Sequence, residues 1–367
     1  MTRLLVIRFS ALGDVAVAVP VVRSLAQRYP EVEITVLSRR QTEPLWRSMP
    51  PNVAFFGVDT KGVHHGIRGL ERLLKELDYR RFDAVADLHN VLRSRWLDLR
   101  FRLAGKRVAV LCKGRWGKWR LVHHVSAGLP VLPSAAERYE QVFFRLGFPL
   151  SSLACHRSIT GVSPEYHRMT EDFDVPFCAD SQSVGKNIGI APFAAHKGKI
   201  YPLDRMEEVV RLLARNMQQR GECVFLFGAG RKEKEVLEDW ERRYPAVVSL
   251  AGKYTMDEEI RRMAGLRLLL TMDSANMHLA SLAETRVLSI WGATHPAAGF
   301  LGFGQRLDDC IQRDLPCRPC SVYGSRSCRY RDYRCLDIPP QQVVSRILEV
   351  LEGEGATDNA ASVPSDM

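Results

Sequence analysis

The first group suited to catalysis is a carboxylate that follows an apolar run at the start of the chain. Residues 4–7 are typical of a buried strand, and residues 8–14 lead from it into a helical pattern. Gly13 allows a tight turn between strand and helix. Asp14 then lies near the helix start, where a carboxylate commonly caps free N–H groups. It could also take a proton from a sugar hydroxyl as a general base. The residues alone leave both roles open.

Two turns in the second half of the chain carry groups suited to binding phosphate. Residues 196–202 leave a strand through a cationic turn that contains Lys199 and then enter a helix. Residues 268–272 form a strand that is followed by Asp273, Ser274 and another helix. Exposed N–H groups at a helix start attract anions, and the helix dipole adds to this attraction. Capping is the alternative, but two such turns, one with lysines, favour an anion site.

Positive charge is concentrated in one stretch of the first half. The formal net charge of +10 and the pI near 9.3 favour an anionic partner without choosing one. Between residues 92 and 120, Asp98 is the only acid. A solvated helix face is one explanation, and a docking surface for phosphate, carboxylate or lipid headgroups is the other. The basic residues and tryptophans of this stretch are Arg93, Arg95, Trp96, Arg100, Arg102, Lys106, Arg107, Lys113, Arg115, Trp116, Lys118, Trp119 and Arg120.

Cysteine spacing and hydropathy bear on metal binding and location. Cys317, Cys320, Cys328 and Cys335 have spacing that could form a tetrahedral zinc site, and such a site would serve folding only. Free buried thiols or an adventitious disulfide are the alternative.

No apolar run reaches the ~20 residues that span a bilayer, and the first residues are unlike a signal peptide. We therefore expect a cytoplasmic protein with mostly reduced cysteines.

Short strands alternate with amphipathic helices along the chain, which is the pattern of parallel α/β sheets. Ligands of such sheets bind beyond the carboxyl ends of the strands, where Asp14, Lys199 and Asp273 all fall. The predicted strands are residues 4–7, 33–37, 84–87, 107–110, 187–191, 223–228, 247–250, 268–272 and 287–291. The predicted helices are residues 19–28, 139–146, 206–219, 232–242, 257–264, 277–283 and 341–351.

The length of 367 residues suits two domains. We predict α/β architecture with two doubly wound Rossmann-like domains facing a cleft. The first covers residues 1–165 and the second residues 187–340, with a linker at 166–186 between them. A C-terminal helix at 341–353 and a disordered tail at 354–367 complete the chain.

Together these motifs resemble glycosyltransferase family 9, the ADP-heptose:lipopolysaccharide heptosyltransferases, from residue 4 to about residue 351. Residues 8–14 match the family's Arg-x-Ser-x-x-Gly-Asp start. The resemblance implies that Asp14 is the catalytic base, with Ser10 and Gly13 on the acceptor side. Residues 87–94 look like the family's acceptor segment, which implies acceptor contacts from Arg93 and Ser94. Asn90 stands where this family often has glycine.

The donor side of the resemblance lies in the second domain. Residues 199–202 match a Lys-x-aromatic-Pro motif whose lysine contacts the donor diphosphate. Residues 273–278 match the Asp-Thr/Ser-x-x-x-His signature at the sugar and phosphates, and residues 252–255 fall where the family places a residue against the adenine. The implied donor-binding residues are Lys199, Tyr254, Asp273, Ser274, Ala275, Asn276 and His278.

The resemblance implies a GT-B fold and an inverting glycosyltransferase that uses no catalytic metal and no cofactor. Its donor would be a nucleotide sugar, ADP-heptose, and its acceptor an anionic glycolipid such as the lipid A–Kdo core of lipopolysaccharide. The enzyme would touch the cytoplasmic face of the inner membrane peripherally and would bind no nucleic acid. A nucleotide-sugar epimerase of the same architecture and a non-catalytic nucleotide-sugar-binding protein are the two alternatives.

Overall fold

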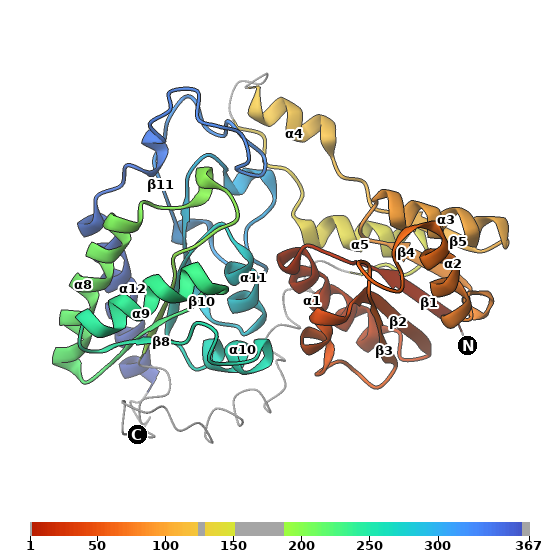
Figure 1. Ribbon diagram of the computed structural model, residues 1–367, viewed down its shortest axis with the longest axis horizontal. Helices are drawn as coiled ribbons and strands as arrows, with labels where there is room; N and C mark the ends of the chain where they lie inside the picture. Colours follow the sequence, from red (N-terminus) through yellow and green to blue (C-terminus); the bar gives the residue numbers. More distant parts are fainter. Residues whose placement is uncertain (1, 124–128, 151–186, 362–367) are drawn as a thin grey trace, which may run out of the picture. The chain divides into compact units, whose positions relative to one another are not determined.

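The computed structural model describes residues 2–123, 129–150 and 187–361, and the linker predicted at 166–186 lies outside them. The chain divides into two compact units, whose helices and strands Figure 1 labels in chain order. The first unit is Met1–Glu165 together with Ala297–Gly304, and the second is Tyr166–Pro296 together with Gln305–Met367. Each unit holds one parallel sheet with helices, which confirms the predicted α/β class.

The first unit is built on a five-stranded parallel sheet in the order β3-β2-β1-β4-β5. The central strand β1 pairs with β2 on one side and β4 on the other, so Val6 lies between Val36 and Ala86. These central residues are apolar because both faces of the sheet are covered. The strands are β1 (Thr2–Ile7), β2 (Val32–Arg39), β3 (Val53–Val58), β4 (Ala84–Asp87) and β5 (Arg107–Val110).

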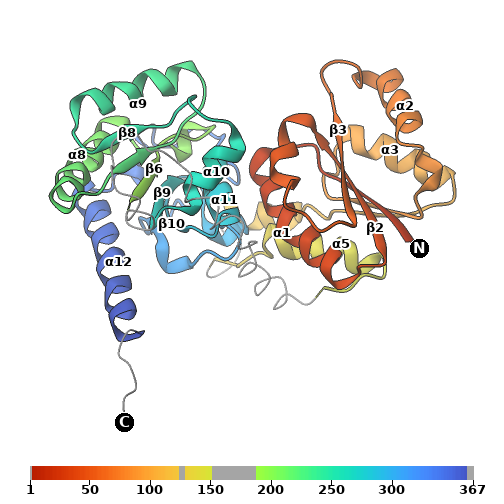
Figure 2. The same ribbon diagram turned by 90° about the horizontal axis from the view of Figure 1, so that it is seen from below.

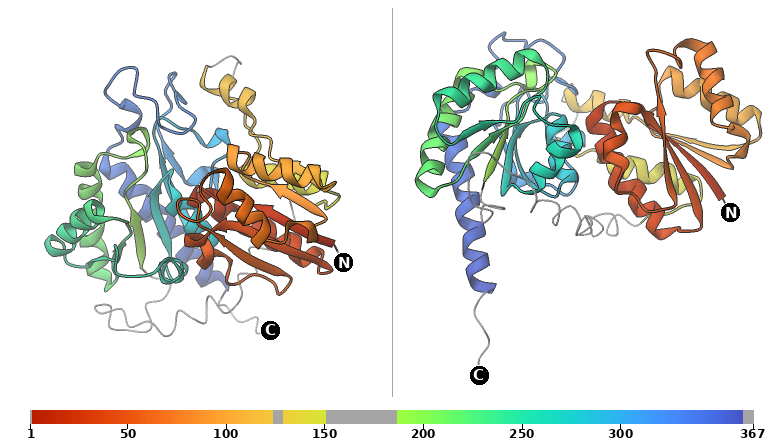
Figure 3. Two further views of the ribbon diagram at one scale, coloured as in Figure 1. Left: turned by 45° about the vertical axis from the view of Figure 1, so that its right-hand side comes forward. Right: turned by 60° about the horizontal axis from the view of Figure 1, so that its bottom comes forward.

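Helices cover both faces of this first sheet (Figure 2). Helices α1 and α5 pack against each other on one face, and α2 and α3 pack on the other. Helix α4 stands apart from these layers in both Figure 1 and the left view of Figure 3. The bounds are α1 (Leu12–Arg28), α2 (Gly66–Glu76), α3 (Leu92–Leu103), α4 (Arg115–Val122) and α5 (Ala135–Arg145).

The second unit has a six-stranded parallel sheet in the order β11-β10-β9-β6-β7-β8. Helices α8, α9 and α12 share one core with this sheet, while α10 and α11 pack together against the other face. The strands are β6 (Ile188–Ala191), β7 (Val224–Leu226), β8 (Val247–Ser249), β9 (Leu268–Met272), β10 (Arg286–Trp291) and β11 (Cys310–Gln312). The helices are α8 (Leu203–Arg220), α9 (Arg231–Arg243), α10 (Met256–Ala264), α11 (Ala275–Leu282) and α12 (Pro340–Ala361).

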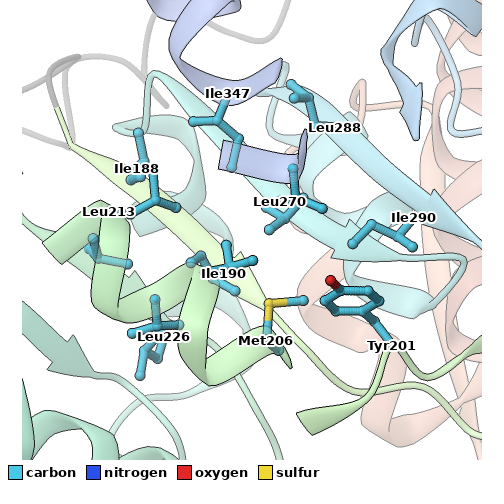
Figure 4. Close-up of a cluster of buried hydrophobic side chains, with 14 of the residues drawn as sticks. Ile188, Ile190, Tyr201, Met206, Leu213, Leu226, Leu270, Leu288, Ile290 and Ile347 are labelled. Atoms are coloured by element: carbon cyan, nitrogen blue, oxygen red, sulfur yellow. The ribbon is translucent and has the colours of Figure 1, made fainter. Parts of the chain in front are cut away.

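The core of the second unit fixes the loop that carries Lys199. Ile190 of β6, Leu270 of β9 and Leu213 of α8 lie in one hydrophobic core, and all three are fully buried (Figure 4). Tyr201 joins the same core, and its hydroxyl donates to the carbonyl of Ile338 at 2.6 Å. Because Tyr201 is anchored in this way, the turn two residues before it has little freedom to move.

Each sheet has one point at which the strand order reverses. In the first sheet this point lies between β1 and β4, and in the second between β6 and β9. Loops leave such a point in opposite directions, which is why ligands of open α/β sheets bind there. Asp14 follows β1, Lys199 follows β6 and Asp273 follows β9. The topology therefore puts the predicted chemistry where a ligand of this kind of sheet binds.

The structure corrects several predicted boundaries. Residues 297–304 belong to the first unit, because Ala297 accepts the N–H of Leu132 at 2.8 Å and Gly299 accepts that of Ala135 at 3.1 Å. The predicted tail begins too early, because helix α12 continues past residue 353 to Ala361. It includes Gly353 and Gly355, each of which costs a helix only about 1 kcal/mol. The sequence also does not predict strands β3 and β11. None of the helices in the described ranges is long and apolar enough to cross a bilayer.

Candidate active site

Asp14 lies in the first turn of α1, directly after the loop that leaves β1. Its side chain is 37 % exposed and forms an ion pair with Arg8. It also accepts a hydrogen bond from the backbone N–H of Ala11 at 3.2 Å, so it does help to cap the helix N-terminus. Both contacts use Oδ2, and Oδ1 has no hydrogen-bond partner among the described residues. The geometry therefore combines capping by one oxygen with a second oxygen that can accept a proton.

Arg8 holds the Asp14 carboxylate in one orientation. The Arg8 side chain is only 7 % exposed, and its Nη1 donates to the carbonyl of Leu88 at 2.5 Å. Its guanidinium also lies over the ring of Tyr139, 5.7 Å from the centroid. The Tyr139 hydroxyl in turn donates to the backbone carbonyl of Asp14 at 3.2 Å. Arg8 and Tyr139 thus form a rigid support for Asp14, which the sequence did not predict.

A pocket of about 520 Å³ opens where the loops after β1, β4 and β5 meet. Four of its lining residues are cationic and none is a carboxylate. Burial and the nearby Arg115 guanidinium lower the pKa of Lys113, and the Asp87 carboxylate offsets this only in part. Such a pocket suits a phosphate or carboxylate group. It is lined by Ser10, His89, Asn90, Val91, Leu92, Arg93, Arg95, Lys113 and Arg115.

The residues predicted for the acceptor side fall into two groups. Ser10 and Arg93 line the pocket. Gly13 is buried at the start of α1, where it allows close packing. Ser94 is fully buried and does not line the pocket: its hydroxyl accepts the N–H of Val91 at 3.0 Å and donates to the Val91 carbonyl at 3.1 Å. Ser94 therefore shapes the segment from inside rather than offering a hydroxyl to a ligand.

A buried pair of carboxyl groups supports the pocket from below. Asp87 Oδ1 accepts the backbone N–H groups of His89 at 2.7 Å and Asn90 at 2.9 Å. Asn90 has a left-handed φ of 52°, a conformation that asparagine tolerates and glycine favours. Burial and the neighbouring Asp87 raise the pKa of Asp98 to about 8. Near neutral pH the pair therefore shares one proton, which lets Asp98 donate a hydrogen bond to Asp87.

His89 is the pocket residue that sequence reasoning missed most clearly. Its Nε2 lies 3.5 Å from Oγ of Ser10, and its ring packs edge-on against Phe9. Burial, followed by the charge of Arg8, lowers the pKa of His89 to about 3. The imidazole is therefore neutral at physiological pH and can offer a hydrogen bond without adding positive charge. Its position two residues after the strand end was the available signal.

In the second unit, Lys199 and Asp273 meet although 74 positions separate them in the chain. Lys199 Nζ lies 2.8 Å from Asp273 Oδ2, with the two side chains 14 % and 4 % exposed. The hydroxyl of Thr294 donates to the same carboxylate oxygen at 2.8 Å. The backbone can come this close because Gly198 has no side chain, since a Cβ there would lie 2.9 Å from Cβ of Ala293. The two turns predicted to bind phosphate thus form one site.

The remaining predicted donor residues start helix α11. Ser274 is its N-cap residue, with Oγ 3.2 Å from Oγ1 of Thr271. Ala275 and Asn276 begin the helix, where backbone N–H groups have no carbonyl one turn earlier to bind. His278 lies one turn further along the same helix. This start can hold an anion beside the Lys199 ammonium.

Arg318, in the cysteine-containing loop, fixes the loop that carries Thr294. Its side chain is buried, and its guanidinium donates to the carbonyls of Gly292 at 2.5 Å and Thr294 at 2.9 Å. The same loop brings Gly324 against Lys199, since a Cβ on Gly324 would lie 2.6 Å from Cγ of the lysine. The cysteine-containing loop therefore supports the Lys199–Asp273 pair, a role that its spacing did not indicate.

The structure does not favour a zinc site in that loop. Cys317, Cys320, Cys328 and Cys335 are free, and burial raises the pKa of the Cys335 thiol to about 11. Within the described ranges, no group of three or more His, Cys, Asp or Glu side chains is placed to hold a metal ion. Zinc binding by these cysteines stays a prediction.

Tyr254 immediately precedes Thr255, the N-cap residue of α10. The guanidinium of Arg262 lies over its ring, 3.4 Å from the centroid. In the part of the chain that the structure describes, no hydrogen bond or ion pair joins Tyr254 to Lys199 or Asp273. Its predicted place against the adenine stays a prediction.

Known proteins resemble this chain over most of its length. Residues 70–330 match the model of glycosyltransferase family 9 (heptosyltransferase). The chain belongs to glycosyltransferase family 9. It is 23 % identical over 294 residues to the lipopolysaccharide core heptosyltransferase OpsX of Haemophilus influenzae, covering 80 % of each chain.

Solved structures confirm the GT-B fold of this family 9 glycosyltransferase. A family 9 glycosyltransferase from Veillonella parvula superposes with a TM-score of 0.71 at 19 % identity, covering 96 % of this chain and 98 % of that one. The ADP-heptose lipopolysaccharide heptosyltransferase II of Escherichia coli gives a TM-score of 0.67 at 22 % identity, covering 97 % of this chain and 100 % of the other.

Proposed function

We propose that this glycosyltransferase moves a heptosyl group from ADP-heptose to the lipopolysaccharide core or a related envelope glycolipid. Family membership supports transfer of a sugar, and the Haemophilus relative is a lipopolysaccharide core heptosyltransferase. The Escherichia coli structure of the same fold is an ADP-heptose heptosyltransferase. The observation that carries the proposal is Asp14, a fixed carboxylate with one oxygen open to a substrate at the end of the central strand.

In the proposed reaction Asp14 is the general base. The acceptor hydroxyl attacks the anomeric carbon of the donor while the bond from that carbon to the diphosphate oxygen breaks. The hydroxyl proton passes to Oδ1 of Asp14, and the nucleoside diphosphate leaves. A single displacement of this kind inverts the anomeric configuration. It requires neither a metal ion nor a cofactor as electron acceptor.

Charge on the departing diphosphate is proposed to be stabilised in the second unit. Lys199 and the N–H groups of Ala275 and Asn276 supply this positive potential, a contribution that is often the largest in catalysis. Asp273, held by Thr294, would then accept hydrogen bonds from sugar hydroxyls. Ser274 and His278 brace the turn or contact a phosphate, and Tyr254 packs against the adenine.

The cationic pocket in the first unit is proposed to bind the acceptor. Its excess of positive charge fits the carboxylates and phosphates of a lipid A–Kdo core better than a neutral glycan. An acceptor anchored in the inner membrane would bring the enzyme into peripheral contact with its cytoplasmic face. His89 and Ser10 would then offer neutral hydrogen bonds to acceptor hydroxyls.

A thermal-shift screen against nucleotides and nucleotide sugars tests the donor. A ligand present at 100 times its Kd adds about 2.7 kcal/mol of stability, so the true donor stands out in a panel. We expect ADP and ADP-heptose to raise the melting temperature and UDP-sugars to leave it unchanged. The reverse pattern would overturn the choice of donor. Product analysis with donor alone then separates transfer from epimerisation.

A further inference from the structure

Helix α4 presents two large aromatic rings to solvent. Trp116 is 69 % exposed and Trp119 is 45 % exposed. The two indoles stack with centroids 5.1 Å apart and an interplanar angle of 11°. On its other side, Trp119 stacks on the ring of His123 at 4.6 Å. The three rings form a continuous aromatic surface.

The opposite face of α4 is buried, so only the face that carries the aromatic rings is exposed to solvent. Leu121 is fully buried against Ala297 and Ala298 of the same unit, with Leu132 and Phe300 packed around them. At 100° per residue, Trp116, Trp119, Arg120 and His123 fall on the side away from Leu121. Packing in the first unit thus fixes α4 and leaves its aromatic side outward.

The charged residues of α4 itself are all cationic. Arg115 and Arg120 are exposed on the same helix. Asp98, the only acid between residues 92 and 120, is buried in the pair with Asp87. The aromatic surface therefore lies on a helix whose exposed charges include Arg115 and Arg120, and the one acid of this stretch is buried elsewhere in the unit.

We infer that the aromatic face of α4, defined by Trp116, Trp119, Arg120 and His123, docks onto an anionic phospholipid bilayer. Tryptophan rings prefer the headgroup level of a membrane, where one side is apolar and the other wet. Arginines beside them gain from the negative surface potential of anionic lipids. The inference rests on the proposed function for its setting, an acceptor held in a membrane, and it names the surface that makes the contact.

The test is co-sedimentation of the full chain with phosphatidylcholine vesicles and with vesicles that also contain phosphatidylglycerol. We expect W116A/W119A to bind the anionic vesicles about tenfold more weakly than the unmodified chain. Phe144→Ala is the matched control, because Phe144 is 67 % exposed on α5 of the same unit and should leave binding unchanged. Arg120→Gln should weaken binding less and reduce its dependence on salt.

Transfer assays separate this inference from the proposed function. On a deacylated, water-soluble acceptor, W116A/W119A should work as fast as the unmodified enzyme, and it should be slower when the acceptor is embedded in vesicles. Equal vesicle binding by W116A/W119A and the unmodified chain, at equal melting temperature, would overturn the inference. So would loss of activity on the soluble acceptor, which would mean that the rings stack on acceptor sugars. If the unmodified enzyme transfers no sugar, the proposed function is wrong. The membrane-docking inference is still tested in that case, because vesicle binding is measured independently of transfer.

Discussion

The two groups of candidate residues, one in each unit, differ in how their charges are balanced. In the first unit, Asp14 is paired with Arg8, but the nearby pocket carries four further cations with no carboxylate in its lining. In the second unit, the ammonium of Lys199 lies against the buried carboxylate of Asp273. This carboxylate also accepts a hydrogen bond from the Thr294 hydroxyl. The group in the first unit has a surplus of positive charge, and the charges of the group in the second unit balance each other.

This difference suggests that the two groups recognise anions in different ways. A surplus of exposed cations attracts a ligand over a distance and is weakened by salt. A matched, buried pair attracts little from afar, and its groups are already oriented before a ligand arrives. We therefore expect acceptor binding to depend strongly on ionic strength and donor binding to depend more on geometry.

The largest effect should come from removing the proposed base. Asp14→Asn keeps the side-chain shape and the capping acceptor but loses the proton acceptor, so kcat should fall by about two to four orders of magnitude. Donor affinity, measured by calorimetry with ADP, should change little. Retention of more than about a tenth of the original kcat would remove Asp14 from the chemistry.

Breaking the matched pair should act on binding and chemistry together. Lys199→Ala removes a cation from the leaving group, and we expect kcat to fall about 100-fold, with weaker ADP binding. It also leaves Asp273 buried without its cation, so the melting temperature should drop. Lys197→Ala, in the same turn but exposed, is the matched control. Unchanged ADP affinity and rate in Lys199→Ala would mean that the lysine serves only the fold.

Reducing the surplus in the first unit should affect the acceptor alone. The double variant Arg93→Gln with Arg115→Gln removes two pocket cations, and we expect the acceptor KM to rise about tenfold or more. Its salt dependence should become shallower, with the donor KM unchanged. The control is Arg68→Gln with Arg72→Gln, which removes the same charge from the exposed surface of α2. An equal effect of both pairs would mean that only net charge matters.

The smallest effect concerns the proton shared by Asp87 and Asp98. The folded protein keeps a proton on Asp98 up to about pH 8, whereas an unfolded chain releases it near pH 4. Folding stability should therefore fall as pH rises from about 4 to about 8 and then level off. Asp98→Asn should remove this pH dependence of stability, and at pH 8 its melting temperature should be higher than that of the unmodified chain. A variant that melts lower at every pH would show that the carboxylic acid itself is needed for packing.

Sequence patterns predicted the parts of the site that follow strands and begin helices. Asp14, Lys199 and Asp273 could be placed because each stands next to a buried strand, and parallel topology gathers strand ends at one edge. The contact between Lys199 and Asp273 could not be predicted, since it depends on glycine contacts such as Gly198 against Ala293.

Groups that act through burial were not predictable from spacing. Asp98 looks like an ordinary helix acid until its packing against Asp87 is known. Arg318 stands among cysteines that suggest a metal, yet its guanidinium binds backbone carbonyls beside the donor turn. The assignment of residues 297–304 to the first unit likewise depends on backbone hydrogen bonds to Leu132 and Ala135. No local sequence pattern predicts these hydrogen bonds.

The most direct test of the central claim is product analysis after incubating the purified chain with ADP-heptose and a deacylated lipopolysaccharide core acceptor. We predict an acceptor that gains one heptosyl residue of inverted anomeric configuration, one ADP released for each residue transferred, and almost no product with Asp14→Asn. Mass spectrometry and NMR of the product would show both features. ADP release without a modified acceptor, or equal product from Asp14→Asn, would contradict the account.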